Sequence, residues 1–124
     1  MSIYPALRYR DAKAAIAWLK DALGFEEVSV HEADGRVGHA ELAFGDGMIM
    51  LGSAGAGDPH FDRGIGTSSI YLATSEVDAV WERAKAAGAR VTRDLQDMDY
   101  GSREFTVDDP EGNSWSVGTY VPQR

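Results

Sequence analysis

The residues best suited to chemistry in this chain are few, and the most suggestive pair is His39 and Glu41. They are two positions apart in a run that alternates apolar and polar residues, which predicts a strand with both side chains on one face. An imidazole and a carboxylate in this arrangement can supply two metal ligands. A third and a fourth ligand would have to come from Glu104, His60 or Asp62. We therefore interpret His39 and Glu41 as an imidazole–carboxylate pair on a solvated strand face.

Other reactive groups are scarce. The chain contains no cysteine, which excludes disulfides, thiolate metal sites and a cysteine nucleophile, and is typical of a cytosolic protein. No nucleophile elbow supports Ser-His-Asp catalysis. The glycine-rich stretch from Gly52 to His60 lacks the Gly-Lys-Ser/Thr sequence of a phosphate-binding loop, so it is interpreted as a linker.

Charge and hydropathy exclude several partners. The 124 residues carry a formal net charge of -8, which opposes binding to nucleic-acid backbones and anionic membranes. No segment reaches the apolar length that spans a bilayer. Arg8, Arg10 and Asp11 interrupt the region where a signal peptide needs an apolar run, so we expect a cytoplasmic protein.

The elements that must position these groups occur twice. A strand near residues 3–9 precedes an amphipathic helix from Asp11 to Leu23 that ends at Gly24, and a strand at 68–73 precedes a helix over 76–87 that ends at Gly88. Asp11 and Ser75 are the predicted N-caps. Three short strand-like runs follow each helix. We therefore predict a single domain over 1–124, with one module at about 1–53, a linker at 54–66 and a second module at about 67–124.

The alternation within the strands assigns their faces. Ala40, Leu42, Ile49 and Leu51 should face the helix of the first module, and Phe105, Val107, Trp115 and Val117 that of the second. The face turned away from the helices should then carry Tyr4, Arg8, His39, Glu41, Met50, Ser69, Tyr71, Glu104 and Ser116. That face must be covered by curling, by pairing or by enclosing a ligand.

The repeat, together with the sequences from Tyr100 to Phe105 and from Asp109 to Trp115, resembles the vicinal oxygen chelate superfamily. This superfamily includes glyoxalase I, extradiol dioxygenases and bleomycin-resistance proteins. The resemblance implies an α+β fold in which two βαβββ modules form an open, curved mixed sheet with helices on one face. It also implies a homodimer whose clefts lie between modules.

The resemblance also locates the positions where metal-dependent members carry His, Gln or Glu ligands. These are on the first and last strand of each module and correspond to Tyr4, Met50, Ser69 and Ser116. None of these side chains is a good ligand for zinc, iron, nickel or manganese. We therefore expect no metal and no cofactor at the superfamily position.

The sequence supports two candidate functions, one a binding protein and the other an enzyme. The first is a metal-independent protein that binds a small molecule, such as a cationic or aromatic antibiotic, without transforming it. Its ligand-binding residues are predicted to be Tyr4, Arg8, His39, Glu41, Met50, Tyr71, Tyr100, Glu104 and Ser116, which combine apolar wall with polar anchors. The alternative is a glyoxalase-like lyase or isomerase, or a dioxygenase, with a displaced active site or with His39 or Glu104 as general base.

Overall fold

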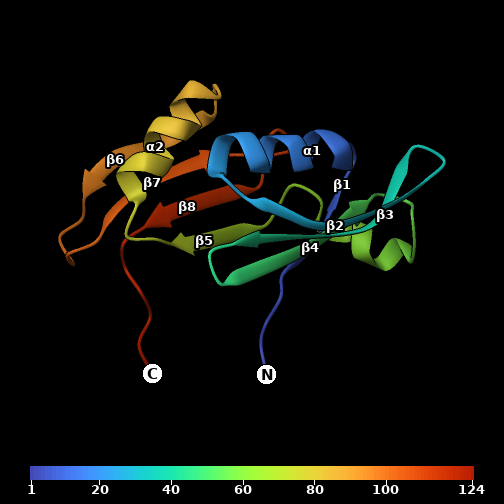
Figure 1. Ribbon diagram of the computed structural model, residues 1–124, viewed down its shortest axis with the longest axis horizontal. Helices are drawn as coiled ribbons and strands as arrows, with labels where there is room; N and C mark the ends of the chain where they lie inside the picture. Colours follow the sequence, from blue (N-terminus) through green and yellow to red (C-terminus); the bar gives the residue numbers. More distant parts are fainter.

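The computed structural model describes residues 1–124, and the same order of elements occurs twice (Figure 1). The first module contains β1 (Ala6–Tyr9), α1 (Ala12–Trp18) continued by the π-helical turn η1 (Leu19–Leu23), β2 (Glu26–Ala33), β3 (Arg36–Phe44) and β4 (Gly47–Ser53). The second contains β5 (Ser69–Ala73), α2 (Val77–Ala86), β6 (Arg90–Asp97), β7 (Arg103–Asp108) and β8 (Ser114–Gly118). The predicted α+β fold of two βαβββ units is confirmed.

The strands form two four-stranded sheets, in the orders β1-β4-β3-β2 and β5-β8-β7-β6. In each sheet the first strand runs parallel to the last strand of its module, and the other pairs are antiparallel. The register places Ala6 beside Met50 and Tyr71 beside Ser116. Residues from the two ends of each module therefore share one sheet surface, as the alternation predicted.

The helices begin and end largely where the sequence indicates. The Asp11 carboxylate accepts a hydrogen bond of 3.0 Å from the Ala14 amide, and Gly24 and Gly88 adopt left-handed φ angles of 81° and 75°. The prediction of Ser75 as an N-cap was wrong. The Thr74 hydroxyl instead accepts from the Glu76 amide, because a threonine can close this two-residue turn just before the helix. No helix is long and apolar enough to cross a membrane.

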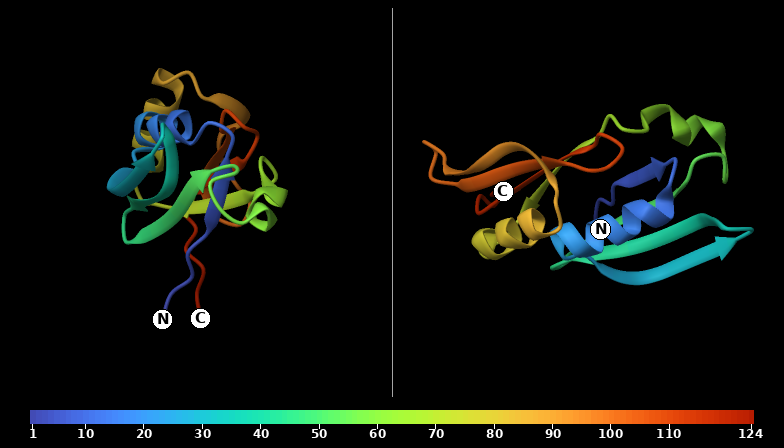
Figure 2. Two further views of the ribbon diagram at one scale, coloured as in Figure 1. Left: turned by 90° about the vertical axis from the view of Figure 1, so that its right-hand side faces the viewer. Right: turned by 90° about the horizontal axis from the view of Figure 1, so that it is seen from above.

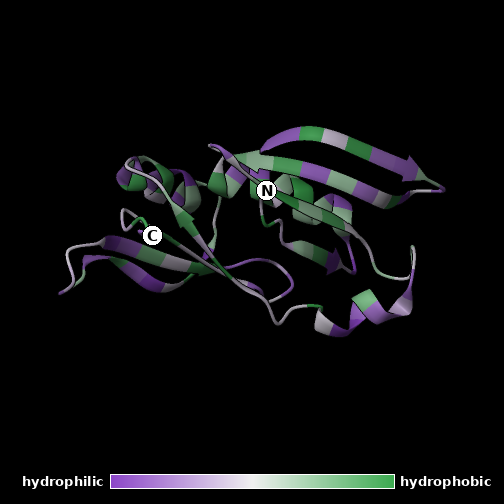
Figure 3. Cartoon of the chain, turned by 90° about the horizontal axis from the view of Figure 1, so that it is seen from below, coloured by the Kyte–Doolittle hydropathy of each residue, from purple (hydrophilic) through white to green (hydrophobic).

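The core lies between the sheets and the helices. Apolar and polar residues alternate along the strands (Figure 3), and the residues assigned to the helix side are buried, including Leu42, Val107 and Trp115, which are 0% exposed. Phe25 of the first module packs edge-on against Trp115 of the second, with ring centroids 5.7 Å apart. One hydrophobic core therefore spans both modules.

The two modules meet at their helices, and the sheets extend to opposite sides of this junction (Figures 1 and 2). α2 packs against η1, where the Arg83 guanidinium donates to the carbonyl oxygens of Lys20 and Asp21 at 3.4 and 3.5 Å. A cation at these carbonyls complements the C-terminal end of the first helix. The junction fixes the two sheets relative to each other.

The turn from Asp109 to Asn113 ties the modules together on a second side. The Glu111 carboxylate accepts hydrogen bonds from the amides of Arg10 and Asp11, at 2.7 and 2.8 Å, at the start of α1. The Asn113 side chain accepts from the Ser68 amide, next to β5. The motif that supports the family resemblance therefore links the end of the chain to the start of α1 in the first module and to the start of β5 in its own module.

The connector between the modules is more ordered than the expected loop. It contains a 3-10 helix, η2 (Pro59–Gly64), in which the Asp58 carboxylate accepts from the His60 amide. A proline at the first turn has the φ angle of a helix and needs no amide partner there, so Asp58 and Pro59 start this turn. η2 carries Phe61 to the surface of the first sheet.

Candidate functional site

The residues predicted to line one site occupy hollows on two separate sheets. On the first sheet, Arg8, His39 and Met50 line a hollow of about 230 Å³. Tyr4 and Glu41 line an adjoining hollow of about 250 Å³, which also includes Met50. On the second sheet, one hollow of about 570 Å³ is lined by Tyr71, Tyr100, Glu104 and Ser116. The structure brings these residues together in two groups.

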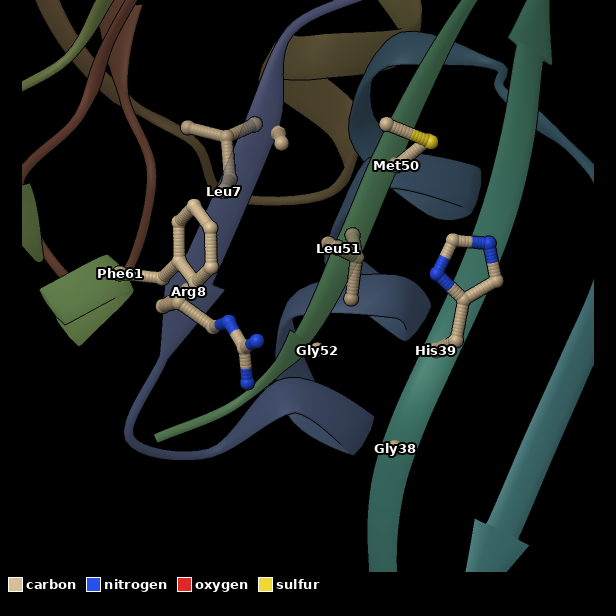
Figure 4. A pocket seen from close by; sticks show the side chains of 9 residues that line it. Leu7, Arg8, Gly38, His39, Met50, Leu51, Gly52 and Phe61 are labelled. Carbon is tan, nitrogen blue, oxygen red and sulfur yellow. The ribbon is translucent and has the colours of Figure 1, made fainter. Parts of the chain in front are cut away.

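The first-sheet hollow combines apolar side chains with one cationic wall. Met50 and Phe61 supply apolar surface, and Arg8, Met50 and His39 project from neighbouring strands (Figure 4). The Arg8 guanidinium donates a 3.0 Å hydrogen bond to the Ser53 carbonyl and lies 5.7 Å from the ring centroid of Phe61. At this distance a guanidinium is attracted to the face of an aromatic ring.

Phe61 was missed by the sequence analysis. It lies on the connector, where no periodicity assigns a face, yet its side chain covers Arg8 at the hollow. The signal that could have identified it is a large aromatic residue within an otherwise polar segment from Asp58 to Arg63. An exposed aromatic side chain next to a hollow is a typical ligand contact.

His39 and Glu41 form the pair that the sequence predicts. The His39 Nε2 atom lies 2.9 Å from Glu41 Oε2. The His31 ring, on the neighbouring strand β2, is stacked on the His39 ring with 6.5 Å between the ring centroids. No group of three or more His, Asp or Glu side chains gathers in a way that could hold a metal ion. The pair is a hydrogen-bonded unit on an accessible strand face.

The second-sheet hollow is organised around Glu104. Its Oε1 atom accepts from Arg93 Nη2 at 2.9 Å and from the Tyr100 hydroxyl at 2.8 Å. Burial of the carboxylate disfavours its charge, but hydrogen bonds from Ser102, Tyr100 and Arg93, with the Arg93 charge, outweigh burial and lower the pKa of Glu104. The same hydrogen bond to Glu104 is the main reason why the pKa of Tyr100 is raised.

The ion pair with Arg93 reduces the negative charge that Glu104 can offer to a ligand. A cationic antibiotic was one of the expected ligands, and Glu104 was one of its predicted contacts. Its charge is compensated by Arg93 and its side chain is only 7% exposed. Such a partner could not be predicted, because Arg93 and Glu104 come together only through the β6–β7 register.

The chain's final residues form one wall of the same hollow. The Tyr71 hydroxyl donates a 2.6 Å hydrogen bond to the Tyr120 carbonyl, and the Tyr120 amide donates to the Ser102 hydroxyl at 3.0 Å. The Tyr120 ring lies 6.5 Å from the rings of both Tyr71 and Tyr100. Burial raises the pKa of Tyr71 above its ordinary value.

Arg93 and Tyr120 are the second-sheet residues that sequence reasoning missed. The period of two groups Arg93 with Val91 and Leu95, which pack against the core, so only the register shifts of β6 against β7 bring it to the hollow. Tyr120 follows the last strand, where the sequence has no periodicity, and only the hydrogen bonds of the tail place it in the hollow.

The positions of the superfamily's metal ligands hold an unsuitable donor set. Tyr4 lies before β1 and is 51% exposed, and Met50 is on β4. Ser69 and Ser116 are on the second sheet, and the Ser116 hydroxyl lies 2.9 Å from that of Thr106. Three hydroxyls and a thioether do not fit the zinc, iron, nickel or manganese sites of this fold, which use imidazole and carboxylate.

The comparisons with known proteins agree with this architecture. The model of the Glyoxalase/Bleomycin resistance protein/Dioxygenase superfamily matches residues 3–117. The uncharacterized protein Mb0911c of Mycobacterium bovis is 32% identical, over 97% of this chain and 84% of that protein. The uncharacterized protein Rv0887c of Mycobacterium tuberculosis is also 32% identical, over 97% of this chain and 75% of that protein.

Solved structures give the same result. TioX from Micromonospora sp. ML1 is similar with a TM-score of 0.80 and 29% identity, covering 97% of this chain and 100% of TioX. A glyoxalase I mutant from Zea mays has a TM-score of 0.74 and 18% identity, covering 96% of this chain and 44% of that one. The second likeness shows the fold alone.

Proposed function

Because this chain belongs to the Glyoxalase/Bleomycin resistance protein/Dioxygenase superfamily, we propose that it binds a small molecule without a metal and without transforming it. The observation that carries the proposal is the donor set at Tyr4, Met50, Ser69 and Ser116, which lacks the imidazole and carboxylate of metal-dependent members. The superfamily's bleomycin-resistance branch sequesters drugs in this way. An aromatic antibiotic is the ligand class that we propose.

The composition of the two hollows supports a binding role. Ligand sites for small molecules have volumes of roughly 300–1,000 Å³ and combine apolar walls with a few polar groups. The second-sheet hollow, at about 570 Å³, falls in this range, and tyrosine rings provide its walls. We propose that contacts come from both sheets through Tyr4, Arg8, His39, Glu41, Met50, Tyr71, Tyr100, Glu104 and Ser116.

We further propose that two copies of the chain pair to complete the site. Both termini leave the molecule on the same side (Figure 1), and they expose Ile3, Tyr4, Tyr120 and Val121. Exposed apolar side chains that lie together on one side favour association. A symmetric dimer would cover them and could bring the first-sheet hollow of one copy to the second-sheet hollow of the other.

One observation favours the alternative of an enzyme. The His39–Glu41 unit lies beside Met50 in an accessible hollow, and a carboxylate hydrogen-bonded to an imidazole can support proton abstraction. A lyase or isomerase that uses His39 as general base is therefore the second candidate. A dioxygenase is less well supported, because it needs metal ligands that the superfamily position does not provide.

The deciding experiment is calorimetric titration with a panel of glycopeptide, aromatic and cationic antibiotics, together with a glyoxalase assay on the glutathione hemithioacetal with and without added zinc or nickel. Saturable binding without turnover supports the binding role. Metal-dependent turnover without drug binding would reverse the order of the two candidates, as would elemental analysis that finds about one transition metal per chain. The cytoplasmic location stays a prediction.

A further inference from the structure

We infer that Arg93 binds a hydrogen-bond acceptor of the ligand, and that Glu104 is the positioning residue that holds Arg93 for this role. The second-sheet hollow would then select a flat ligand with a carboxylate or carbonyl group over a cationic one. This inference rests on the proposed binding function and names the ligand class for that site.

The first step is that Glu104 is already paired within the protein. Its Oε1 atom accepts from both Arg93 and Tyr100, and little of the side chain is exposed. The β7–β8 register places Glu104 beside Gly118, where an added Cβ would lie 2.5 Å from Glu104 Cγ and 2.8 Å from the Tyr71 hydroxyl. The glycine lets these groups pack directly on the backbone.

The second step is that some N–H groups of the Arg93 guanidinium have no hydrogen-bond partner within the protein. A guanidinium has five N–H donors in a planar fork. Nη2 is paired with Glu104 and Nε is buried, so the N–H groups of Nη1, which have no hydrogen-bond partner in the protein, are the donors left for a ligand. The Arg93 side chain is 35% exposed and lines the hollow. A planar donor group held on one edge by a carboxylate is a preorganised site for a carboxylate or carbonyl oxygen.

The third step concerns the walls. The hydroxyls of Tyr71 and Tyr100 are occupied by the Tyr120 carbonyl and by Glu104, so these residues offer the ligand their ring surfaces. Tyr120 adds a third ring at 6.5 Å from each. Aromatic rings prefer offset or edge-on contact with other flat rings, which favours a flat ligand. The polar recognition is left to Arg93.

The test uses three probes with the same ring system: 2-naphthoate, 2-acetylnaphthalene and 2-naphthylmethylammonium. Calorimetric titration of the wild-type protein should show naphthoate binding about tenfold tighter than the ammonium probe, the factor that one charge-assisted hydrogen bond supports. The carbonyl probe should fall between them. This order runs against the net charge of -8, which by itself attracts the cation.

Variants separate the two residues. Arg93→Gln should remove the preference for naphthoate, whereas Arg90→Gln, an exposed arginine of the same strand that loses the same charge, should preserve it. Glu104→Gln should weaken naphthoate binding several-fold, because it removes the carboxylate that holds Arg93, but it should keep the order of the probes, because Arg93 retains its charge. If Arg93→Gln does not fold, the order of the three probes in the wild-type protein and a shift of the Arg93 Nε resonance on adding naphthoate still test the inference.

The outcomes are distinct. Tighter binding of the ammonium probe, with loss of that binding in Glu104→Gln, would overturn the assignment of Arg93 while leaving the proposed binding function intact. Absence of saturable binding for all three probes would overturn the inference, whereas the proposed function is decided by the titration with antibiotics.

Discussion

The phenol of Tyr9 donates a 2.7 Å hydrogen bond to the Oδ2 atom of Asp109, 100 positions away in the sequence. The same oxygen accepts from Trp115 Nε1 at 3.0 Å and from Asn113 Nδ2 at 2.9 Å. Tyr9 and Trp115 are 0% exposed. One buried carboxylate thus joins the end of β1 to the last hairpin of the chain, and the two sheets keep their relative position partly through it.

Replacing this carboxylate should destabilise the fold strongly. Asp109→Ala leaves the donors of Tyr9, Trp115 and Asn113 buried without an acceptor, and we expect a loss of about 3 kcal/mol or more in the free energy of unfolding. Tyr9→Phe removes one hydrogen bond and should cost about 1–2 kcal/mol. Urea denaturation followed by tryptophan fluorescence measures both. Equal effects from the two substitutions would contradict the role of Asp109 as a shared acceptor.

Alkaline pH should lower the free energy of unfolding because of the buried phenol of Tyr9. Burial and the neighbouring Asp109 charge raise the pKa of Tyr9 above its ordinary value of 10.0. The unfolded chain therefore loses this proton first, so the stability that Tyr9 contributes is complete below pH 10 and falls as pH rises further. Denaturation curves from pH 8 to 11 should show this decline in the wild-type protein and a weaker one in Tyr9→Phe. A decline of the same slope in both proteins would exclude Tyr9 as its source.

Acidic pH should lower the free energy of unfolding through the Glu104 carboxylate of the second sheet. The partners of Glu104 lower its pKa below the ordinary value of 4.5. Its contribution to stability is then present above pH 4.5 and is lost as pH falls through the folded-state pKa. Glu104→Gln should flatten the acid side of the stability profile, while Glu82→Gln, on a side chain that is 72% exposed, should leave it unchanged. An unchanged profile in Glu104→Gln would contradict the network around Arg93.

Ligand binding should depend on the Tyr71 ring. Tyr71→Ala removes an aromatic wall of the second-sheet hollow, and binding of an aromatic ligand should weaken by about 1–3 kcal/mol. Tyr71→Phe keeps the ring and removes only the hydrogen bond to the Tyr120 carbonyl, so it should retain most of the affinity. Calorimetry with 2-naphthoate measures the difference. If Tyr71→Phe lost as much as Tyr71→Ala, the hydroxyl would be the important group.

The proposed dimer should depend on the terminal segments. Ile3 and Val121, near the two ends of the chain, are 93% and 55% exposed, and both ends leave the fold on the same side (Figure 1). Sedimentation velocity should show a dimer at micromolar concentration, and Ile3→Asp combined with Val121→Asp should shift it toward monomer, because each substitution places a charge in an apolar contact. Val28→Asp, at an equally exposed position on the outer strand β2, is the control. A monomer for the wild-type chain would refute the dimer.

The sequence predicted most of the fold because the relevant signals are local. Apolar spacing and end signals such as Asp11, Gly24 and Gly88 identify the helices, and alternation assigns Leu42 and Val107 to the buried side of their strands. The start of α2 was misjudged because Thr74 and Ser75 are both capable of closing a turn, and local spacing does not choose between them.

The candidate site shows where local signals end. The period of two correctly placed His39, Met50, Tyr71 and Glu104 on helix-free faces, since it depends only on neighbours along the chain. Their separation into two hollows follows from the two sheets, and Phe61 and Tyr120 enter these hollows from segments without periodicity.

The sequence by itself determined the two βαβββ units, the faces of their strands and the absence of good metal ligands at the superfamily positions, because these depend on residue type and short-range spacing. Only the tertiary structure decided that Arg93 neutralises Glu104 and that Tyr9 binds Asp109. Each of these pairs requires strand register or module packing to bring together groups that the sequence separates, and the free energy of a buried charge depends on such neighbours.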